Sequence, residues 1–358
     1  MNTLIKWPGG KGREFAYIKD IIPDFDRYIE PFFGGGAVFF NLEPKTSAIN
    51  DLSEDLINFY KQIKGRSAEF REKLDQYSNV FDGALAQGRS AFDKLKVIFD
   101  NYDEDALMEI VSDITGELII DNDVLETNFT AVIFKYVKDK LLRTKKNNEA
   151  HPFSEDDLKE NLATGFSSGV YMYFRHRYNS MRRNPSNFSD AERAANFYFI
   201  REYCYGSMFR FNSLGNFNIP YGGVTYNKKN FRGKVQHILS DEVANLFSNC
   251  TIENLDFEEF LKGIDLNERD FIFLDPPYDT EFSDYDGNDF TKKDQERLRD
   301  TLKGIPAKFI LIIKNTDFIY SLYKDDFNIA TFDKTYSYNV KSRNDRSVEH
   351  LIITNFEI

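Results

Sequence analysis

The feature that most constrains the fold is a short apolar run that ends in an acid and two prolines. Residues 271–274 are all apolar, and Asp275, Pro276, Pro277 and Tyr278 follow directly. A continuous apolar run of this length predicts a strand buried on both faces, as in a parallel sheet. The prolines end the strand, because proline has no N–H to give to a sheet ladder. The sequence therefore places a carboxylate at the carboxyl end of a buried strand, where open α/β sheets bind ligands.

The chemistry that suits this tip is methyl transfer to an amino group conjugated with a ring. The lone pair of such an amine is delocalised, so the amine is a poor nucleophile. The Asp275 carboxylate and the Pro276 carbonyl can accept its two N–H hydrogen bonds and stabilise the positive charge that develops. Tyr278 can stack on the ring. An ordinary Pro-Pro turn has the same residues, so the tip alone leaves that alternative open.

Two glycine-rich turns near the N-terminus are candidate ligand sites. The first spans residues 7–13 and contains the only tryptophan, Trp7, together with Lys11. It is typical of an anion-binding or ligand-capping loop, or of a plain flexible turn. A helix from about Glu14 to Ile22 is predicted next. The second turn lies within residues 28–39, whose pattern is strand, glycine turn and helix, and its glycines would let a ligand approach the backbone.

Two further short strands are each followed by an acid. Residues 47–50 precede Asp51, at the place where nucleotide-binding βαβ units hold ribose hydroxyls with an acid. Asp51 could equally cap the helix that follows. Residues 250–255 precede Asp256 and Phe257, which predict either contacts with an adenine ring or a helix cap beside a core phenylalanine.

Between residues 65 and 235 the alternation of strands and helices stops, which predicts an inserted domain. Its first half is acidic with helical periodicity, and a basic, turn-rich segment is predicted from Lys135 to Lys146. Residues 171–235 contain eleven Lys and Arg but three Asp and Glu, a net charge of +8 in a chain of −12. With interleaved Asn and aromatic residues, this composition is typical of a nucleic-acid surface, although a basic subunit contact is an alternative.

Within this basic half, residues 210–223 predict a β-hairpin or looped ribbon, which fits a DNA major groove. A basic loop near the C-terminus is expected to touch phosphate. The candidate DNA-binding residues are Arg210, Asn212, Asn218, Pro220, Tyr221, Lys228, Lys229, Arg343 and Arg346.

Composition excludes several classes of protein. No apolar run is long enough to span a membrane, and the first residues do not resemble a signal peptide. The two cysteines, Cys204 and Cys250, argue against a disulfide scaffold and fit a reducing cytoplasm. Four scattered histidines and two cysteines show no metal-ligand spacing, so no metal site is predicted.

Five motifs, taken in order, resemble the Dam-type, class alpha DNA adenine methyltransferases. They are residues 6–11, the Phe32-Gly34-Gly36 turn after Glu30, Asp51, the ribbon 210–222, and residues 275–278. The resemblance implies a Rossmann-like, S-adenosylmethionine-dependent methyltransferase sheet built from residues 1–64 and 236–358. It also implies an inserted, mostly helical target-recognition domain, residues 65–235, that carries a β-hairpin.

The resemblance also implies roles for individual residues. It assigns cofactor binding to Trp7, Lys11, Phe32, Gly34, Gly36 and Asp51, and Glu30, Asp256 and Phe257 complete the set of candidates. Residues 275–278 would grip an adenine flipped out of the duplex, because its 6-amino group is otherwise engaged in pairing. Family members that read GATC tend to carry Tyr-Asn-Gly where this chain has residues 205–207, and a basic residue in place of Gly223. No GATC target is therefore predicted.

The predicted function is site-specific adenine methylation of double-stranded DNA. The alternatives are a methyltransferase that acts on RNA or on a protein amide, and a DNA-binding homologue without catalysis. Amide methylases share the Pro-Pro-Tyr tip but usually carry Asn at the position of Asp275, and the intact tip argues against an inactive homologue. A cognate restriction endonuclease is a candidate partner. The oligomeric state is left open, with a monomer favoured.

Overall fold

The protein consists of two compact units. The computed structural model describes residues 1–10, 12, 14–118, 128–277, 290–335 and 347–357. The first unit comprises residues 1–64 and 241–358, and the second comprises residues 65–240. The second boundary follows Ser240 rather than residue 235, because helix α10 (Phe231–Ile238) packs on helix α4 of the second unit.

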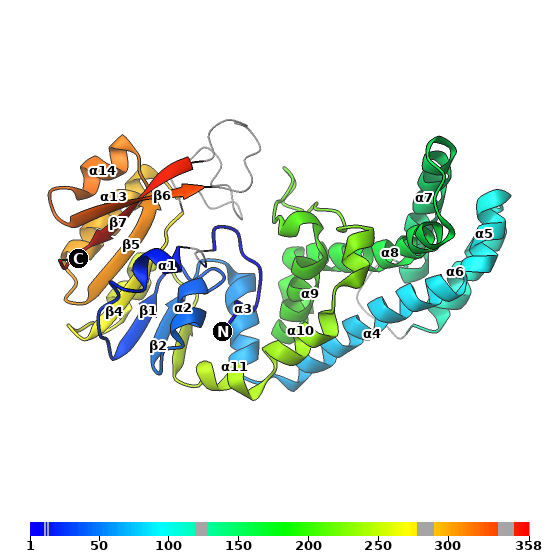
Figure 1. Ribbon diagram of the computed structural model, residues 1–358. Coiled ribbons are helices and arrows are strands. Elements are labelled where there is room, and N and C mark those ends of the chain that lie inside the picture. The colour runs from blue at the N-terminus through cyan, green and yellow to red at the C-terminus, as the bar shows by residue number, and fades with distance from the viewer. Residues whose placement is uncertain (11, 13, 119–127, 278–289, 336–346, 358) are drawn as a thin grey trace. The chain divides into compact units, whose positions relative to one another are not determined.

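The described residues of the first unit form a seven-stranded sheet in the order β3-β2-β1-β4-β5-β7-β6 (Figure 1). The strands are β1 (Arg27–Glu30), β2 (Ser47–Asn50), β3 (Cys250–Glu253), β4 (Asp270–Leu274), β5 (Lys308–Lys314), β6 (Asn328–Thr335) and β7 (Ser347–Thr354). Strands β1 to β5 pair in parallel, and β7 lies antiparallel between β5 and β6. The predicted α/β, Rossmann-like methyltransferase fold class is confirmed.

Helices cover both faces of this sheet. They are α1 (Phe15–Ile18), α2 (Ala37–Leu42), α3 (Glu54–Lys64), α11 (Asp241–Leu246), α12 (Phe257–Gly263), α13 (Lys292–Lys303) and α14 (Asp317–Tyr323). Side chains alternate along a strand, so Ile29 of β1 joins a core with α12, α13 and α14. Its neighbour Tyr28 turns to the opposite face, where its ring lies 6.2 Å from that of Phe39 on α2. Helix α1 is shorter than the predicted helix from Glu14 to Ile22.

The order of the strands reverses between β1 and β4. From β1 the chain adds β2 and, after the insertion, β3 on one side, and it then adds β4 and β5 on the other. Connections to helices therefore leave the two central strands in opposite directions. The carboxyl ends of β1 and β4 consequently flank the position where open α/β sheets bind ligands.

The second unit is mostly helical. Its helices are α4 (Ala68–Ser90), α5 (Phe92–Asp100), α6 (Glu104–Gly116), α7 (Phe129–Ala150), α8 (Glu155–Arg183), α9 (Asp190–Tyr203) and α10, with short 3₁₀ turns at Pro185–Asn187, Tyr205–Ser207 and Val224–Lys228. Serine side chains cap three of the long helices: Ser67, Ser154 and Ser189 each accept a backbone N–H of the first turn.

The prediction of a turn-rich segment from Lys135 to Lys146 is wrong, because these residues lie within the continuous helix α7. Lys, Arg and Leu are good helix formers. The buried side chains Val137 and Leu141 also repeat every four residues along one helix face. Glycines on α8 let α7 approach closely: a Cβ at Gly165 would lie 2.9 Å from the Cα of Val137.

Residues 204–221 form a looped ribbon rather than a hairpin of regular strands. Two isolated β-bridges, Cys204 with Tyr221 and Phe211 with Phe217, mark its two ends. At the tip, Asn212 N–H donates to the Asn216 carbonyl at 2.9 Å. The paired backbone turns back on itself as the sequence predicted, but the pairing is sparse.

Candidate functional site

The carboxyl ends of β1 and β4 carry two of the predicted motifs. The two strands pair in parallel, with Ile29 opposite Ile272. Phe32 and Asp275 each lie three positions further along. The glycine turn and the Asp-Pro-Pro segment therefore leave the same edge of the sheet from neighbouring strands.

Trp7 packs directly on the glycine turn that follows β1. Gly34 and Gly36 have φ angles of +52° and +65°, in the left-handed region that favours glycine. A Cβ at Gly34 would lie 2.8 Å from Trp7 Cδ1, and one at Gly36 would lie 2.5 Å from Phe33 Cζ. Side chains larger than hydrogen are thus excluded from the turn, and the indole and the bare backbone form one wall of a candidate cofactor site.

Asp51 connects the end of β2 to this turn. Its Oδ2 accepts the backbone N–H of Gly34 at 2.7 Å, and its Oδ1 accepts the backbone N–H of Ser53 at 2.9 Å. These bonds order the glycine turn and the backbone that leads into α3, which begins at Glu54, so Asp51 lies before the N-cap position of that helix. The ribose role of Asp51 stays a prediction.

Asn50, next to Asp51, was not identified from the sequence. Its buried side chain donates to the carbonyls of Pro31 and Leu255, both at 3.0 Å, and accepts the N–H of Leu255 at 2.9 Å. One amide therefore holds the ends of β1, β2 and β3 together. The signal that could have revealed it is a polar residue within an otherwise apolar strand end, since a buried amide must find partners.

Asp256 and Phe257 have structural partners of their own. Asp256 Oδ1 accepts the N–H of Glu258 at 3.0 Å, which caps α12, and pairs with Arg297 at 2.6 Å. Phe257 is 4% exposed, and its ring centroid lies 5.4 Å from that of Phe32. The helix-cap and core roles are present, and contact of these residues with an adenine ring stays a prediction.

Glu30, at the end of β1, is buried and accepts a hydrogen bond from the Tyr28 hydroxyl at 2.8 Å. Burial raises the pKa of Tyr28 well above its ordinary value, and the Glu30 charge adds to this effect. Tyr28 therefore stays a neutral donor. The structure places Glu30 on the side of the sheet that faces Tyr28, and its role toward a cofactor stays a prediction.

A helix anchors the Asp-Pro-Pro segment after β4. Asp275 is half-buried and Pro276 is buried, whereas Pro277 is exposed. The fully buried Gln295 of α13 donates from Nε2 to the Pro277 carbonyl at 3.1 Å. Its Oε1 is buried without a hydrogen-bond partner in the described part of the chain. Gln295 was not identified from the sequence, because its role depends on a contact made only after folding.

The predicted DNA-binding residues of the ribbon differ in their surroundings. Arg210 and Pro220 are exposed. Asn212 Oδ1 accepts the N–H groups of Leu214 and Asn216, both at 3.0 Å, so this side chain shapes the tip. Asn218 Oδ1 is buried and has no partner among the described residues. Exposure thus makes Arg210 the ribbon side chain best placed to meet a ligand.

Beyond the ribbon tip, two of the three candidates have partners within the unit. Tyr221 is 8% exposed and donates to Asn227 Oδ1 at 2.7 Å. Lys229 Nζ lies 3.7 Å from the centroid of the Tyr226 ring, whereas Lys228 is exposed. The candidates that lie outside the described residues are Lys11, Tyr278, Arg343 and Arg346.

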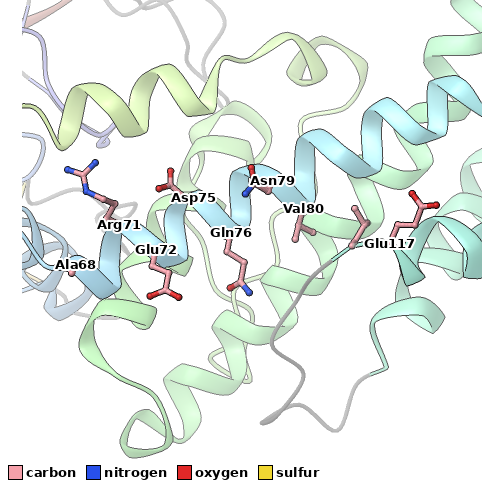
Figure 2. A pocket seen from close by; sticks show the side chains of 9 residues that line it. Ala68, Arg71, Glu72, Asp75, Gln76, Asn79, Val80 and Glu117 are labelled. Carbon is pink, nitrogen blue, oxygen red and sulfur yellow. The ribbon is translucent and has the colours of Figure 1, made fainter.

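The second unit also has an open hollow of about 570 Å³ along α4 (Figure 2). Its charged lining is mainly acidic, with Glu72, Asp75 and Glu117 against a single cation, Arg71. Such a lining repels phosphate. The hollow is therefore not a candidate nucleic-acid site.

Neither cysteine has the properties of a nucleophile. Cys204 and Cys250 are buried, and burial raises the pKa of each thiol to about 11. Thiolates are the reactive form, so both thiols are inert near neutral pH. Within the described ranges no cluster of three His, Cys, Asp or Glu could hold a metal ion, and no helix is long and apolar enough to cross a membrane.

The sheet order, the glycine turn with Asp51, and an Asp-Pro-Pro tip at the end of β4 together define a Rossmann-like methyltransferase. The family model for D12 class N6 adenine-specific DNA methyltransferases matches residues 7–108 and 97–338. The chain belongs to this family. The family recognised from its motifs, and its activity as an adenine-specific DNA methyltransferase, are confirmed.

Several relatives are similar to this chain along most of their length. The chain is 24% identical to the type II methyltransferase M.CviBI of Paramecium bursaria Chlorella virus NC1A, covering 99% of this chain and 100% of that protein. It is 25% identical to the type II methyltransferase M1.LlaDCHI of Lactococcus lactis subsp. cremoris, covering 99% and 96%. It is 22% identical to the DNA adenine methylase of Escherichia coli strain K12, covering 88% and 81%.

Proposed function

We propose that the protein transfers a methyl group from S-adenosylmethionine to the 6-amino group of an adenine flipped out of double-stranded DNA at a specific sequence. One observation carries the proposal: an Asp-Pro-Pro segment and a Trp7-backed glycine turn leave neighbouring strands at the switch point of the sheet. This arrangement offers acceptors for an amine next to a site for a nucleoside-containing cofactor.

The residues of the first unit fit such a cofactor. The glycine turn offers a close approach to bare backbone, since a Cβ at Gly34 would collide with Trp7. The Asp51 carboxylate, which accepts two backbone N–H groups, lies at the end of β2, where an acid of a nucleotide-binding βαβ unit accepts ribose hydroxyls. When bound, S-adenosylmethionine supplies an electrophilic methyl group. Trp7, the glycine turn and Asp51 would hold and orient it.

The end of β4 would hold the acceptor. The Asp275 carboxylate and the Pro276 carbonyl are proposed to accept the two N–H hydrogens of the adenine amine. They orient its lone pair and stabilise the developing positive charge. Because Gln295 fixes the next carbonyl, that of Pro277, the segment is ordered before the substrate arrives. Tyr278 is proposed to stack on the flipped base.

We assign target recognition to the second unit. Residues 171–235 have a net charge of +8, which suits a phosphate backbone despite the overall charge of −12. The exposed Arg210 is proposed to read a base edge. Two relatives are named type II methyltransferases, which favours a cognate restriction endonuclease as partner. We further propose that the protein acts as a monomer in the cytoplasm.

Methyl transfer from labelled S-adenosylmethionine to methylation-free genomic DNA tests this function. We expect 6-methyladenine confined to one short sequence, mapped at base resolution. The Asp275→Ala variant serves as the control and should give no signal. Label found on RNA or protein and absent from DNA would overturn the choice of substrate, and failure to bind the cofactor would overturn the enzymatic assignment.

A further inference from the structure

One face of α8 carries hydrogen-bonding side chains that all contact the ribbon. They recur every fourth residue, a spacing that places them on the same side of a helix. We call this set the α8 ladder: Tyr171, Arg175, Asn179 and Arg183. Their partners lie in residues 216–219 of the ribbon, which we call the return arm.

Asn179 hydrogen-bonds the backbone of the return arm in the way that a neighbouring strand would. Its Nδ2 donates to the Phe217 carbonyl at 3.1 Å, and its Oδ1 accepts the Phe217 N–H at 2.8 Å. Both bonds are buried. Buried backbone groups need partners, and a single amide here satisfies the donor and the acceptor of one residue.

The other rungs hold the residues on either side. Tyr171 donates its hydroxyl to the Ile219 carbonyl at 2.9 Å. Arg175 Nη1 donates to the carbonyls of Asn218 and Ile219, at 3.1 and 3.3 Å. At the end of the helix, Arg183 Nη1 donates to Asn216 Oδ1 at 2.9 Å. Every residue of the return arm is therefore held by α8.

The return arm in turn supports the arm that carries Arg210. The Asn218 N–H donates to the Arg210 carbonyl at 3.3 Å, and the Asn212 N–H donates to the Asn216 carbonyl at 2.9 Å. An isolated two-stranded ribbon is marginally stable in water. With such sparse pairing between its arms, this ribbon depends on α8 for a defined backbone.

We propose that the α8 ladder is a set of positioning residues for sequence recognition, which fixes the ribbon backbone so that Arg210 meets a base edge in register. The inference rests on the proposed function, in which the ribbon reads DNA. A bidentate contact between arginine and a base tolerates little displacement, so its contribution to discrimination depends on the rigidity of its support.

The test compares the kcat/KM of methyl transfer on the mapped recognition duplex with that on duplexes changed at one base pair. The variants are Asn179→Ala, Arg210→Ala and the double variant. We expect Asn179→Ala to lower discrimination by about tenfold or more at the base pairs where Arg210→Ala lowers it. In the double variant the loss of discrimination should stay within about twofold of the loss in Arg210→Ala, because Asn179 acts through Arg210.

Asn161→Ala is the matched control. Asn161 also lies on α8, but it bonds to Lys140 Nζ and to the Asp157 carbonyl instead of the ribbon. It should keep its discrimination, and every single variant should bind S-adenosylmethionine as the parent protein does. If Asn179→Ala does not fold, Arg183→Ala replaces it, because the contact of Arg183 with Asn216 is exposed.

Discrimination within about twofold of the parent in the folded ladder variants, or losses that add in the double variant, would overturn the inference. Such a result would leave the proposed function intact, since the parent protein would still methylate one sequence. Absence of methyl transfer by the parent protein would instead overturn the proposed function itself.

Discussion

The carboxylate of Asp51 accepts the backbone N–H of Gly34 at 2.7 Å, so an acid at the end of β2 orders the glycine turn that follows β1. The bond joins two motifs that the sequence separates. It makes the candidate ribose acceptor and the glycine turn of the candidate cofactor site a single structural unit.

Replacing Asp51 should therefore weaken cofactor binding for two reasons. Asp51→Ala removes the acceptor for the ribose and leaves the Gly34 N–H without this partner. Hydrogen bonds to charged groups contribute about 1.5–3 kcal/mol each, so we expect the Kd for S-adenosylmethionine to rise by about ten- to a hundredfold. Isothermal titration calorimetry measures it. Asp20→Ala, on an exposed side chain of the same unit, should bind normally.

Removing the carboxylate at the end of β4 should abolish methyl transfer and leave DNA binding intact. Asp275→Ala is expected to lower kcat by at least about a hundredfold, since the loss of one group that stabilises developing charge has effects of that size. Single-turnover methylation and DNA-binding assays measure the two properties separately. Asp275→Asn keeps one carbonyl acceptor and should fall between the parent and Asp275→Ala. Turnover retained in Asp275→Ala would refute the catalytic assignment.

Gln295 should act on kcat through the backbone that it holds. Gln295→Leu removes the donor to the Pro277 carbonyl while conserving much of the side-chain volume. We expect kcat to fall about tenfold, because small displacements of a positioned group are costly, while the Kd for the cofactor stays unchanged. Glu296→Ala, exposed on the same helix, is the control. A rise in KM alone would show that Gln295 supports binding rather than the acceptor site.

The sheet was largely predictable, because its signals are local. Short strands, each followed by an acid, were predicted at residues 47–50 and 271–274, and they correspond to β2 and β4. The basic helix α7 was misjudged, because its apolar residues are sparse and their partners lie on α8. The α8 glycines that allow α7 to pack closely cannot be recognised from the sequence until the two helices are known to pair.

Supporting residues of the site could not be predicted in the same way. Asn50 joins Pro31 to Leu255, a residue that follows it by more than half of the chain. Gln295 contacts a carbonyl from the middle of a charged helix. The burial of Asn50 at a strand end hints only that it needs partners, and nothing local marks Gln295, because both roles arise from contacts between segments distant in sequence.

Variants at two exposed cations of the second unit should distinguish a residue that reads a base from one that contacts phosphate. Arg210→Ala is expected to relax sequence choice, since one good bidentate base contact contributes about 1–3 kcal/mol of discrimination. Lys228→Ala should instead weaken binding to all duplexes alike. It should also lower the slope of log affinity against log salt concentration by about one, because one phosphate contact is lost. Affinities measured at several salt concentrations distinguish the two. Unchanged specificity in Arg210→Ala would show that another residue reads the base.

The two thiols should not react with alkylating reagents near neutral pH. They should react only in strong alkali or when the protein unfolds. Burial raises the pKa of Cys204 and of Cys250 to about 11, so the thiolate is scarce at pH 8 and grows as the pH rises toward that value. Iodoacetamide at pH 8 should therefore leave methyl transfer unchanged, and mass spectrometry should find both thiols unmodified. Denaturant should expose them and allow rapid alkylation. Rapid inactivation of the folded protein at pH 8 would contradict the buried, non-catalytic state of both cysteines.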